Sequence, residues 1–183
     1  NLFLGLFMAA GFIFAAPAFA EDSADPQITV GNPAEFSPDE PTVMITGANR
    51  GIGLEFVSQF IERGWNIIAT TRDLEASPEL LAMAKDYDRL VVEQLDITDF
   101  ARIDALDAKY SDQPLDLLLS NAGITPKYKS AFKTVDSVDW DMMRMSLEVN
   151  AIGPLKLAQT FMDQVAASKQ KKLVVISSKA GSF

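Results

Sequence analysis

The sequence contains neither cysteine nor histidine among its 183 residues. Disulfides, thiolate metal centres, imidazole zinc sites and histidine-containing catalytic triads are therefore excluded, and we predict no metal site. Any acid–base chemistry must use the side chains of Tyr, Lys, Asp, Glu or Ser. Because both residue types are absent, any reaction catalysed by these residues must need neither a thiolate nor an imidazole.

Positive charge is scarce, with 16 Lys and Arg against 25 Asp and Glu and a formal net charge of −9. A nucleic-acid partner is not expected, because no basic face is available to neutralise phosphates. The global field does not favour acidic substrates either, although a local site can override it. The length is sufficient for one domain with a sizeable core.

Charge is absent altogether from residues 1–20, which are rich in Leu, Phe, Ala and Gly and end in Ala18-Phe19-Ala20. This pattern indicates the apolar region and cleavage site of a signal peptide, and the missing positive start indicates that the sequence begins inside it. The alternative is an uncleaved membrane anchor. We expect a periplasmic or secreted protein after cleavage, and a membrane-anchored protein otherwise.

Residues 21–40 are rich in proline and acidic residues and show little periodicity, so they are predicted to be a linker or a loosely attached arm. From residue 41 onward, apolar runs alternate with helical spacings. The predicted strands are 43–45, 66–71, 90–95, 115–119 and 173–176, and the predicted helices are 54–61, 80–85, 100–110 and 138–168. This order predicts a doubly wound parallel sheet of the Rossmann type over residues 41–183, incomplete after its fifth strand. Its ligand crevice is expected beyond the carboxyl ends of the strands.

Residues 46–53, Thr-Gly-Ala-Asn-Arg-Gly-Ile-Gly, lie between the first predicted strand and the first predicted helix. Glycines let a backbone approach a pyrophosphate closely, and a helix N-terminus supplies unpaired N–H groups. The alternative is an ordinary glycine-rich turn. The candidate cofactor-binding residues of this loop are Gly47, Asn49, Arg50, Gly51, Ile52 and Gly53.

Further candidates lie at or beyond the carboxyl ends of later strands. They are Asp96 and Ile97 after the third strand, Asn121, Ala122 and Gly123 after the fourth, Asn150 in the long helical region, and Ser178 after the fifth strand. Each has a simpler explanation: a helix-capping Asp, an Asn-Ala-Gly turn, a surface Asn and a turn-forming Ser. Their order and spacing together favour a site.

In combination these stretches resemble the short-chain dehydrogenase/reductase family over residues 41–183. The segments Thr-Gly-Ala-Asn-Arg-Gly-Ile-Gly-Leu, Ala-Thr-Thr-Arg-Asp and Ser-Ser-Lys-Ala-Gly-Ser are most similar to its carbonyl-reductase and C-factor-like branch. The resemblance implies that the loop glycines hold the pyrophosphate, that Asp96 and Ile97 border the adenine, and that residues 121–123 pack near the ribose and brace the sheet. It also implies that Asn150 supports a proton relay through water and that Ser178 hydrogen-bonds the substrate carbonyl.

Two departures from the family pattern stand out. Ser120 occupies a position where the family usually has Asn, which weakens the expected bracing. The family's Tyr-x-x-x-Lys pair is absent, because none of the three tyrosines, 87, 110 and 128, is followed by Lys four residues later. We therefore expect the given residues to be the cofactor-binding portion of a parent enzyme, to bind cofactor weakly or not at all, and to be inactive by themselves.

The leading hypothesis for the parent protein is an oxidoreductase that transfers a hydride between a nicotinamide cofactor and a small carbonyl or alcohol substrate. A non-catalytic dinucleotide sensor or interaction module on the same fold is the alternative. An epimerase or dehydratase is disfavoured, because that branch of the family spaces its glycines G-x-x-G-x-x-G. A homo-oligomeric parent is left open.

The choice between NADP and NAD depends on residues near the end of the second predicted strand. Asp73 lies at the spacing of an acidic residue that binds the ribose hydroxyls of NAD. The strand tip, however, is placed at Thr71, which is small and neutral and leaves room for a ribose phosphate. Arg72 and the loop residue Arg50 add two cations suited to a phosphate, so NADP is predicted over NAD. The alternative is that Arg72 and Asp73 form only a solvated surface pair.

Residues 1–20 are predicted to direct export. With a start codon and a positively charged n-region restored, a reporter fused after Asp25 should be exported from a bacterial cytoplasm. Protease accessibility of the reporter in intact spheroplasts measures this. Retention of the reporter in the cytoplasm would contradict the signal-peptide interpretation.

Overall fold

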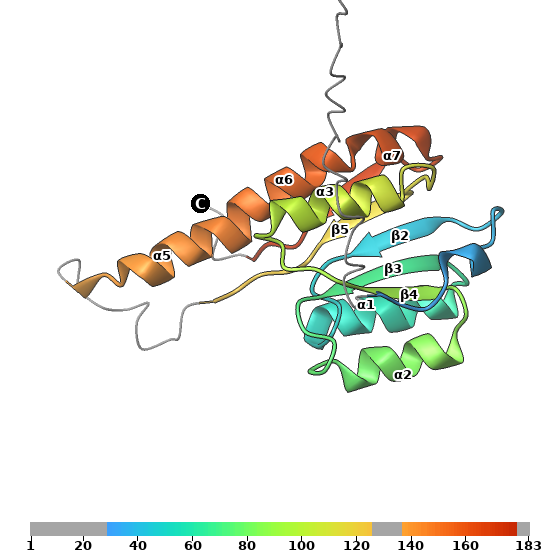
Figure 1. The fold of residues 1–183 in the computed structure, drawn as a ribbon, viewed down its shortest axis with the longest axis horizontal. Coiled ribbons are helices and arrows are strands. Elements are labelled where there is room, and N and C mark those ends of the chain that lie inside the picture. Colours follow the sequence, from blue (N-terminus) through green and yellow to red (C-terminus); the bar gives the residue numbers. More distant parts are fainter. Residues whose placement is uncertain (1–28, 126–136, 179–183) are drawn as a thin grey trace, which may run out of the picture.

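The computed structural model describes residues 29–125 and 137–178. They form a six-stranded sheet in the order β1-β4-β3-β2-β5-β6, in which all neighbours are parallel except β1 and β4 (Figure 1). The strands are β1 (Thr29–Val30), β2 (Thr42–Ile45), β3 (Asn66–Thr71), β4 (Leu90–Gln94), β5 (Leu117–Ser120) and β6 (Lys172–Val175). The helices are η1 (Pro33–Glu35), α1 (Gly51–Glu62), α2 (Pro78–Asp86), α3 (Phe100–Lys109), α5 (Trp140–Leu147), η3 (Glu148–Ile152), α6 (Gly153–Thr160) and α7 (Met162–Ala167). The prediction of a doubly wound, mainly parallel sheet is confirmed.

Both faces of the sheet are covered by helices, α1 and α2 on one and α3, α6 and α7 on the other (Figure 1). Because side chains alternate along a strand, β2 supplies both layers. Val43 and Ile45 pack with Val57 of α1, whereas Met44 packs with Leu157 of α6. All of these side chains are fully buried. The continuous apolar runs that predicted buried strands thus correspond to strands with a core on each side.

Most predicted strands and helices agree with the structure to within one or two residues. The fourth predicted strand is displaced, since β5 begins at Leu117 rather than at Leu115. The carboxylate of Asp116 there accepts from the backbone N–H groups of Thr42 and Gln170, at 3.1 Å each. The long helical region from 138 to 168 is divided, and its middle, η3, is a π-helix.

Residues 29–40 are not the loosely attached arm that the sequence predicted. Thr29 and Val30 pair antiparallel with Glu93 and Val92 at the free edge of β4. Farther along, Ser37 donates its N–H to the Asn66 side chain at 2.9 Å and accepts from it at 2.8 Å. This stretch therefore packs onto the domain, while residues 1–28, which include the predicted signal peptide, lie outside the described residues. Within the described ranges, none of the helices has both the length and the apolarity needed to cross a bilayer.

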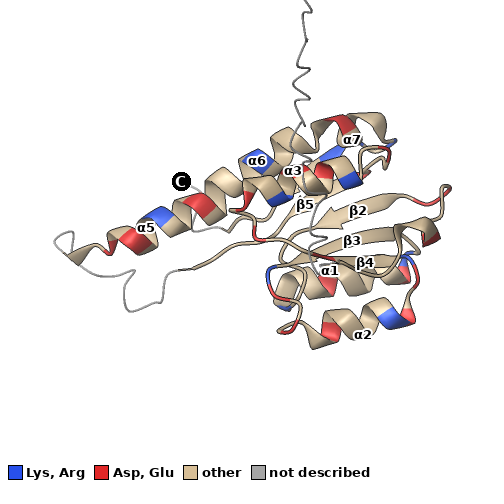
Figure 2. Ribbon diagram, viewed as in Figure 1, with Lys and Arg blue, Asp and Glu red and all other residues tan. Residues whose placement is uncertain are grey.

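Charged residues lie mainly on helices and loops, whereas β2, β3 and β5 carry none (Figure 2). Two described strand residues are charged: Lys172, which is exposed at the start of β6, and Glu93 of β4, whose side chain is fully buried. One carboxylate oxygen accepts from Tyr110 at 2.6 Å and pairs with Lys109, and the other accepts from Thr29 at 2.7 Å and pairs with Arg102 at 3.1 Å. A buried carboxylate is tolerated only with such compensation, and here the compensation joins β1, β4 and α3.

The pKa of Tyr110 is raised well above its ordinary value of 10.0, first by burial and second by the charge of Glu93. The phenol therefore stays protonated in the fold and keeps donating to the carboxylate. Since the folded-state pKa exceeds that of the unfolded chain, this stabilisation is complete below about pH 10 and is lost as the pH rises further.

Replacing Tyr110 by Phe should lower the free energy of unfolding at pH 7 by about 1–3 kcal/mol, because a buried charge loses one donor. The difference from the wild type should shrink at about pH 11, where ionisation of the unfolded tyrosine penalises only the wild type. Urea unfolding at both pH values measures this, with Tyr87→Phe as a control that loses a bond only to the neutral carbonyl of Trp65. Equal stability of Tyr110→Phe and the wild type at pH 7 would contradict the assigned role.

Candidate functional site

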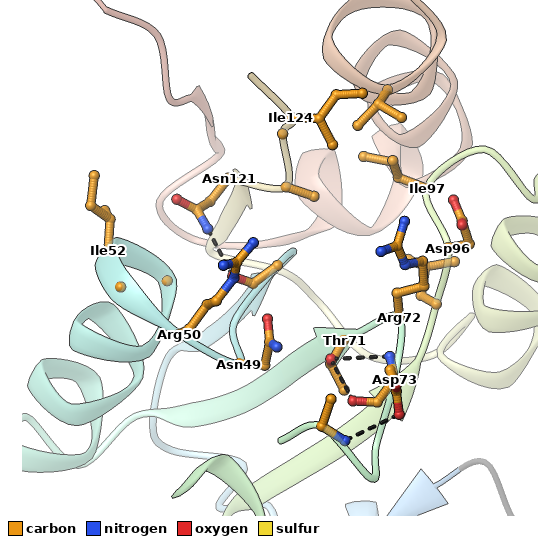
Figure 3. Close-up of a pocket in the computed structure, with 18 residues that line it drawn as sticks. Asn49, Arg50, Ile52, Thr71, Arg72, Asp73, Asp96, Ile97, Asn121 and Ile124 are labelled. Carbon is orange, nitrogen blue, oxygen red and sulfur yellow. Dashed lines mark hydrogen bonds between the residues drawn. The ribbon is translucent and has the colours of Figure 1, made fainter. Parts of the chain in front are cut away.

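A cleft of about 740 Å³ opens at the carboxyl ends of the parallel strands (Figure 3). Its walls come from the segments that follow β2, β3, β4 and β5, together with one residue of η3. The lining residues are Gly47, Asn49, Arg50, Gly51, Ile52, Gly53, Thr71, Arg72, Asp73, Ala76, Leu95, Asp96, Ile97, Asn121, Ala122, Gly123, Ile124 and Val149. Every residue that the sequence predicted to bind the cofactor is among them.

The glycine loop after β2 meets the criteria for a phosphate-binding turn. Gly51, the first residue of α1, has a φ of 55°, and a Cβ placed on it would meet no described atom within 4 Å. Gly53 is crowded instead: a Cβ there would lie 2.2 Å from the carbonyl oxygen of Gly47 and 2.6 Å from the Asn121 amide nitrogen. The loop thus leaves the helix N-terminus open toward the cleft while its own backbone is tightly packed.

Thr46 and Asn121 join the ends of β2 and β5. The Thr46 hydroxyl accepts from the backbone N–H groups of Asn121 and Ala122, both at 3.0 Å. The Asn121 amide donates to the carbonyl oxygens of Thr46 and Gly47, again at 3.0 Å. The bracing implied by the family resemblance is present, and Asn121 rather than Ser120 provides it. The hydroxyl of Ser120 is buried without a hydrogen-bond partner among the described residues.

Two cations border the cleft on the side of β3. Figure 3 shows the side chains of Arg50 and Arg72 extending into the cavity from the glycine loop and from the end of β3. Among the described residues, neither guanidinium has an ion-pair partner. This side of the cleft therefore presents ten potential N–H donors to an anion.

The acidic residue beside Arg72 is engaged elsewhere. Asp73 lines the cleft, but its carboxylate accepts from the backbone N–H of Ala76 at 3.1 Å. Thr71, at the strand tip, is buried and its hydroxyl is hydrogen-bonded to Ser77 at 2.9 Å and to the Asp73 carbonyl at 3.1 Å. Ser77 occupies the N-cap position of α2 but forms no side-chain cap bond, because its hydroxyl is hydrogen-bonded within this turn.

The adjoining part of the wall follows β4, which is the strand beside β3. Ile97 is buried against Gly153, where a Cβ would lie 2.8 Å from the Ile97 carbonyl oxygen, so helix α6 can approach only because that residue is glycine. Asp96 lines the cleft, and its carboxylate accepts from the N–H and hydroxyl of Thr98 at 2.9 and 2.7 Å, but it is not the helix cap that the simpler explanation assumed. The cap of α3 is Asp99.

The two predicted catalytic residues are not among those that line the cleft. Asn150 belongs to the π-helix, and its side-chain amide accepts from the N–H of Ile124 at 2.9 Å and donates to the Ile124 carbonyl at 2.8 Å. It therefore fixes the segment after β5, and π-helical turns are frequent at functional sites. Ser178 is exposed and lies beyond the carboxyl end of β6.

Neither of the two tyrosines in the described residues lines this cleft. Tyr87 donates to the Trp65 carbonyl and Tyr110 to Glu93, both away from the cleft, and Tyr128 lies outside the described residues. Over the described ranges, no group of three or more carboxylates could hold a metal ion.

Sequence reasoning missed four lining residues, Ala76, Leu95, Ile124 and Val149. They are apolar and carry no chemical signature, and only their neighbours along the chain could have indicated them. Leu95 directly precedes Asp96, and Ile124 directly follows Gly123. Val149, by contrast, reaches the cleft through the packing of η3, which the sequence does not reveal.

A family model described as short chain dehydrogenase matches residues 41–183. The chain is similar to (+)-neomenthol dehydrogenase of Arabidopsis thaliana, at 30% identity over 158 residues, which cover 75% of this chain and 53% of the relative. The chain thus spans about half the length of this curated relative.

Solved structures show the same likeness. The NADPH-bound carbonyl reductase from chicken fatty liver superposes with a TM-score of 0.68 at 30% identity, over 82% of this chain and 62% of the other. A carbonyl reductase from Pseudomonas aeruginosa PAO1 in complex with NADP gives a TM-score of 0.68 at 27% identity, over 79% of this chain and 61% of the other.

The two helix-start glycines should respond differently to substitution. Gly53→Ala should lower the free energy of unfolding by about 1–3 kcal/mol, because its Cβ overlaps backbone that cannot yield. Gly51→Asn should cost no more than about 1 kcal/mol, since Asn tolerates the left-handed region and the space is open, but it should abolish dinucleotide binding.

Thermal unfolding and cofactor titration of both variants in the full-length protein test this contrast. Gly64→Asn is the matched control, because Gly64 has a φ of 72° at the other end of α1. It should leave dinucleotide binding unchanged. Undiminished binding by Gly51→Asn would refute the role of the loop.

Proposed function

The chain belongs to the short-chain dehydrogenase family, and we propose that the protein is an NADP-dependent oxidoreductase that transfers a hydride between nicotinamide and a carbonyl or alcohol substrate. The observation that carries the proposal is the convergence of four strand ends on one cleft. All twelve cofactor-binding residues named from the sequence line it. Turns scattered over the surface would not produce this convergence.

The choice of NADP is supported by the charges at the end of β3. Arg50 and Arg72 extend into the cleft, whereas the carboxylate of Asp73 is held by the Ala76 N–H. A guanidinium pairs with a phosphate through bidentate, charge-assisted hydrogen bonds. A carboxylate that pointed at the ribose would favour NAD and repel a 2′-phosphate. Asp73 does not provide such a carboxylate in this conformation, because its side chain is turned toward the Ala76 N–H. Of the similar solved structures, the carbonyl reductase from chicken fatty liver has NADPH bound and that from Pseudomonas aeruginosa has NADP bound.

The cofactor, when bound, supplies the hydride chemistry, and the residues of the chain bind and orient it. We assign the pyrophosphate to the N–H groups at the start of α1 and the adenine to the wall formed by Asp96 and Ile97. Asn150 keeps the segment around Ile124 in place through its two hydrogen bonds. Ser178 is the residue that we assign to the substrate carbonyl, as a hydrogen-bond donor.

Changing both Arg50 and Arg72 to Ala should raise the dissociation constant for NADPH by about 100-fold or more and that for NADH by less than about threefold. The reason is that each charge-assisted hydrogen bond to the ribose phosphate contributes about 1.5–3 kcal/mol. Fluorescence titration of the full-length protein with both cofactors measures the two constants.

The double variant Arg63→Ala with Lys85→Ala is the matched control, because it removes the same charge from exposed positions outside the cleft. It should leave both constants within about twofold, apart from a general field effect. An equal loss for both cofactors in the first variant, or a wild-type preference for NADH, would refute the assignment of NADP.

A further inference from the structure

Gln94, the last residue of β4, does not line the cleft, but it contacts the backbone of Arg72 at the end of β3. Its side-chain amide nitrogen donates to the carbonyl oxygen of Arg72 at 3.0 Å. In the preceding peptide, the Thr71 carbonyl accepts from the N–H of Leu95 at 2.8 Å. Two consecutive carbonyls at the end of β3 are thus held by two consecutive residues of the neighbouring strand.

Gln94 is itself held from the side of helix α3. Its backbone carbonyl accepts from the Nε of Arg102 at 3.0 Å, and the Nη2 of Arg102 donates to Glu93 at 3.1 Å. Glu93 is the fully buried carboxylate that also binds Lys109 and Tyr110. The strand end that carries Gln94 is therefore anchored to this buried polar cluster through Arg102.

Arg72, by contrast, is exposed, and its guanidinium has no ion-pair partner among the described residues. A long side chain of this kind costs rotamer entropy when it is fixed on a ligand. The direction in which it leaves the chain is set by the orientation of its own peptide unit. Two side chains hold the peptide unit that joins Arg72 to Asp73: Gln94 donates to its carbonyl oxygen at 3.0 Å, and the Thr71 hydroxyl accepts from its N–H at 3.3 Å.

We propose that Gln94 is a positioning residue for ribose-phosphate recognition: by holding the Arg72 carbonyl, it aims the guanidinium into the cleft and so contributes to the preference for NADP over NAD. This role rests on the proposed function. It assigns specificity to a residue outside the cleft that acts through another residue, and it links the Glu93 cluster to the cofactor.

The substitution Gln94→Met tests the role, because Met retains the length of the side chain but cannot donate a hydrogen bond. In the full-length protein it should raise the dissociation constant for NADPH about fivefold, the scale of one hydrogen bond, and leave that for NADH within about twofold. In an Arg72→Ala background the same substitution should change the NADPH constant by less than about twofold, since the two residues act as one unit.

Hydrogen–deuterium exchange of the free protein supplies a readout that needs no cofactor. Gln94→Met should accelerate exchange of the amides of residues 72–76 by about threefold or more and leave the rest of the sheet unchanged. Gln59→Met is the matched control, because Gln59 donates to Glu55 on the solvent side of α1. It should change neither exchange at 72–76 nor cofactor preference.

The outcomes separate the two proposals. A wild-type protein without a preference for NADPH contradicts the proposed function, whatever Gln94 does. A wild type that prefers NADPH, with a Gln94→Met variant that keeps the full preference or loses both cofactors equally, overturns only the role of Gln94. Unchanged exchange at residues 72–76 overturns it as well, because the Arg72 peptide would then be fixed by other contacts.

Discussion

The close approach of β2 and β5 beyond their last strand residues is the constraint on which the site depends. At this point the sheet order reverses, since β3 lies on one side of β2 and β5 on the other. The hydroxyl of Thr46 and the amide of Asn121 tie the two strand ends together with four hydrogen bonds. Because the connections leave in opposite directions, a crevice opens between them, and the glycine loop forms its floor. No larger residue than glycine fits at position 53 while these bonds are kept.

A second constraint comes from the edge of the sheet. A free edge strand exposes unpaired N–H and C=O groups, and β4 is covered by the two residues of β1. Such a short pairing is weak by itself, and Thr29 strengthens it by donating to the buried carboxylate of Glu93. The same carboxylate binds α3 through Tyr110 and Arg102. One buried charge therefore protects the edge of the sheet and anchors the end of β4, which leads to Asp96 and Ile97 in the cleft wall.

The sequence predicted those parts of the fold that depend on local pattern. The apolar runs at β2 and β3 and the glycine spacing of residues 46–53 fixed the positions of the strand ends, and hence the residues of the cleft. The sequence did not predict β1. These two residues of a proline-rich stretch form a strand by pairing with β4, and Glu93, which also binds the Thr29 side chain, lies 64 positions later in the chain. The sequence did not predict the π-helix either, and Gly153, which directly follows it, lies close to Ile97 more than 50 positions earlier in the chain. Long-range contacts, which leave no periodic signal, account for these differences.

An acidic protein can still offer a site for a cofactor with several phosphates, because the field in the cleft differs from the net charge of −9. The two carboxylates at the rim, Asp73 and Asp96, each accept hydrogen bonds from nearby backbone or hydroxyl groups, which spread part of their charge. The two guanidinium groups have no such partner among the described residues, and the helix N-terminus adds a positive dipole end. Anion binding here is thus a matter of which charges are already engaged. Under the proposed function, a mutation that released Asp73 from the Ala76 N–H would therefore weaken phosphate binding although no positive charge would be removed.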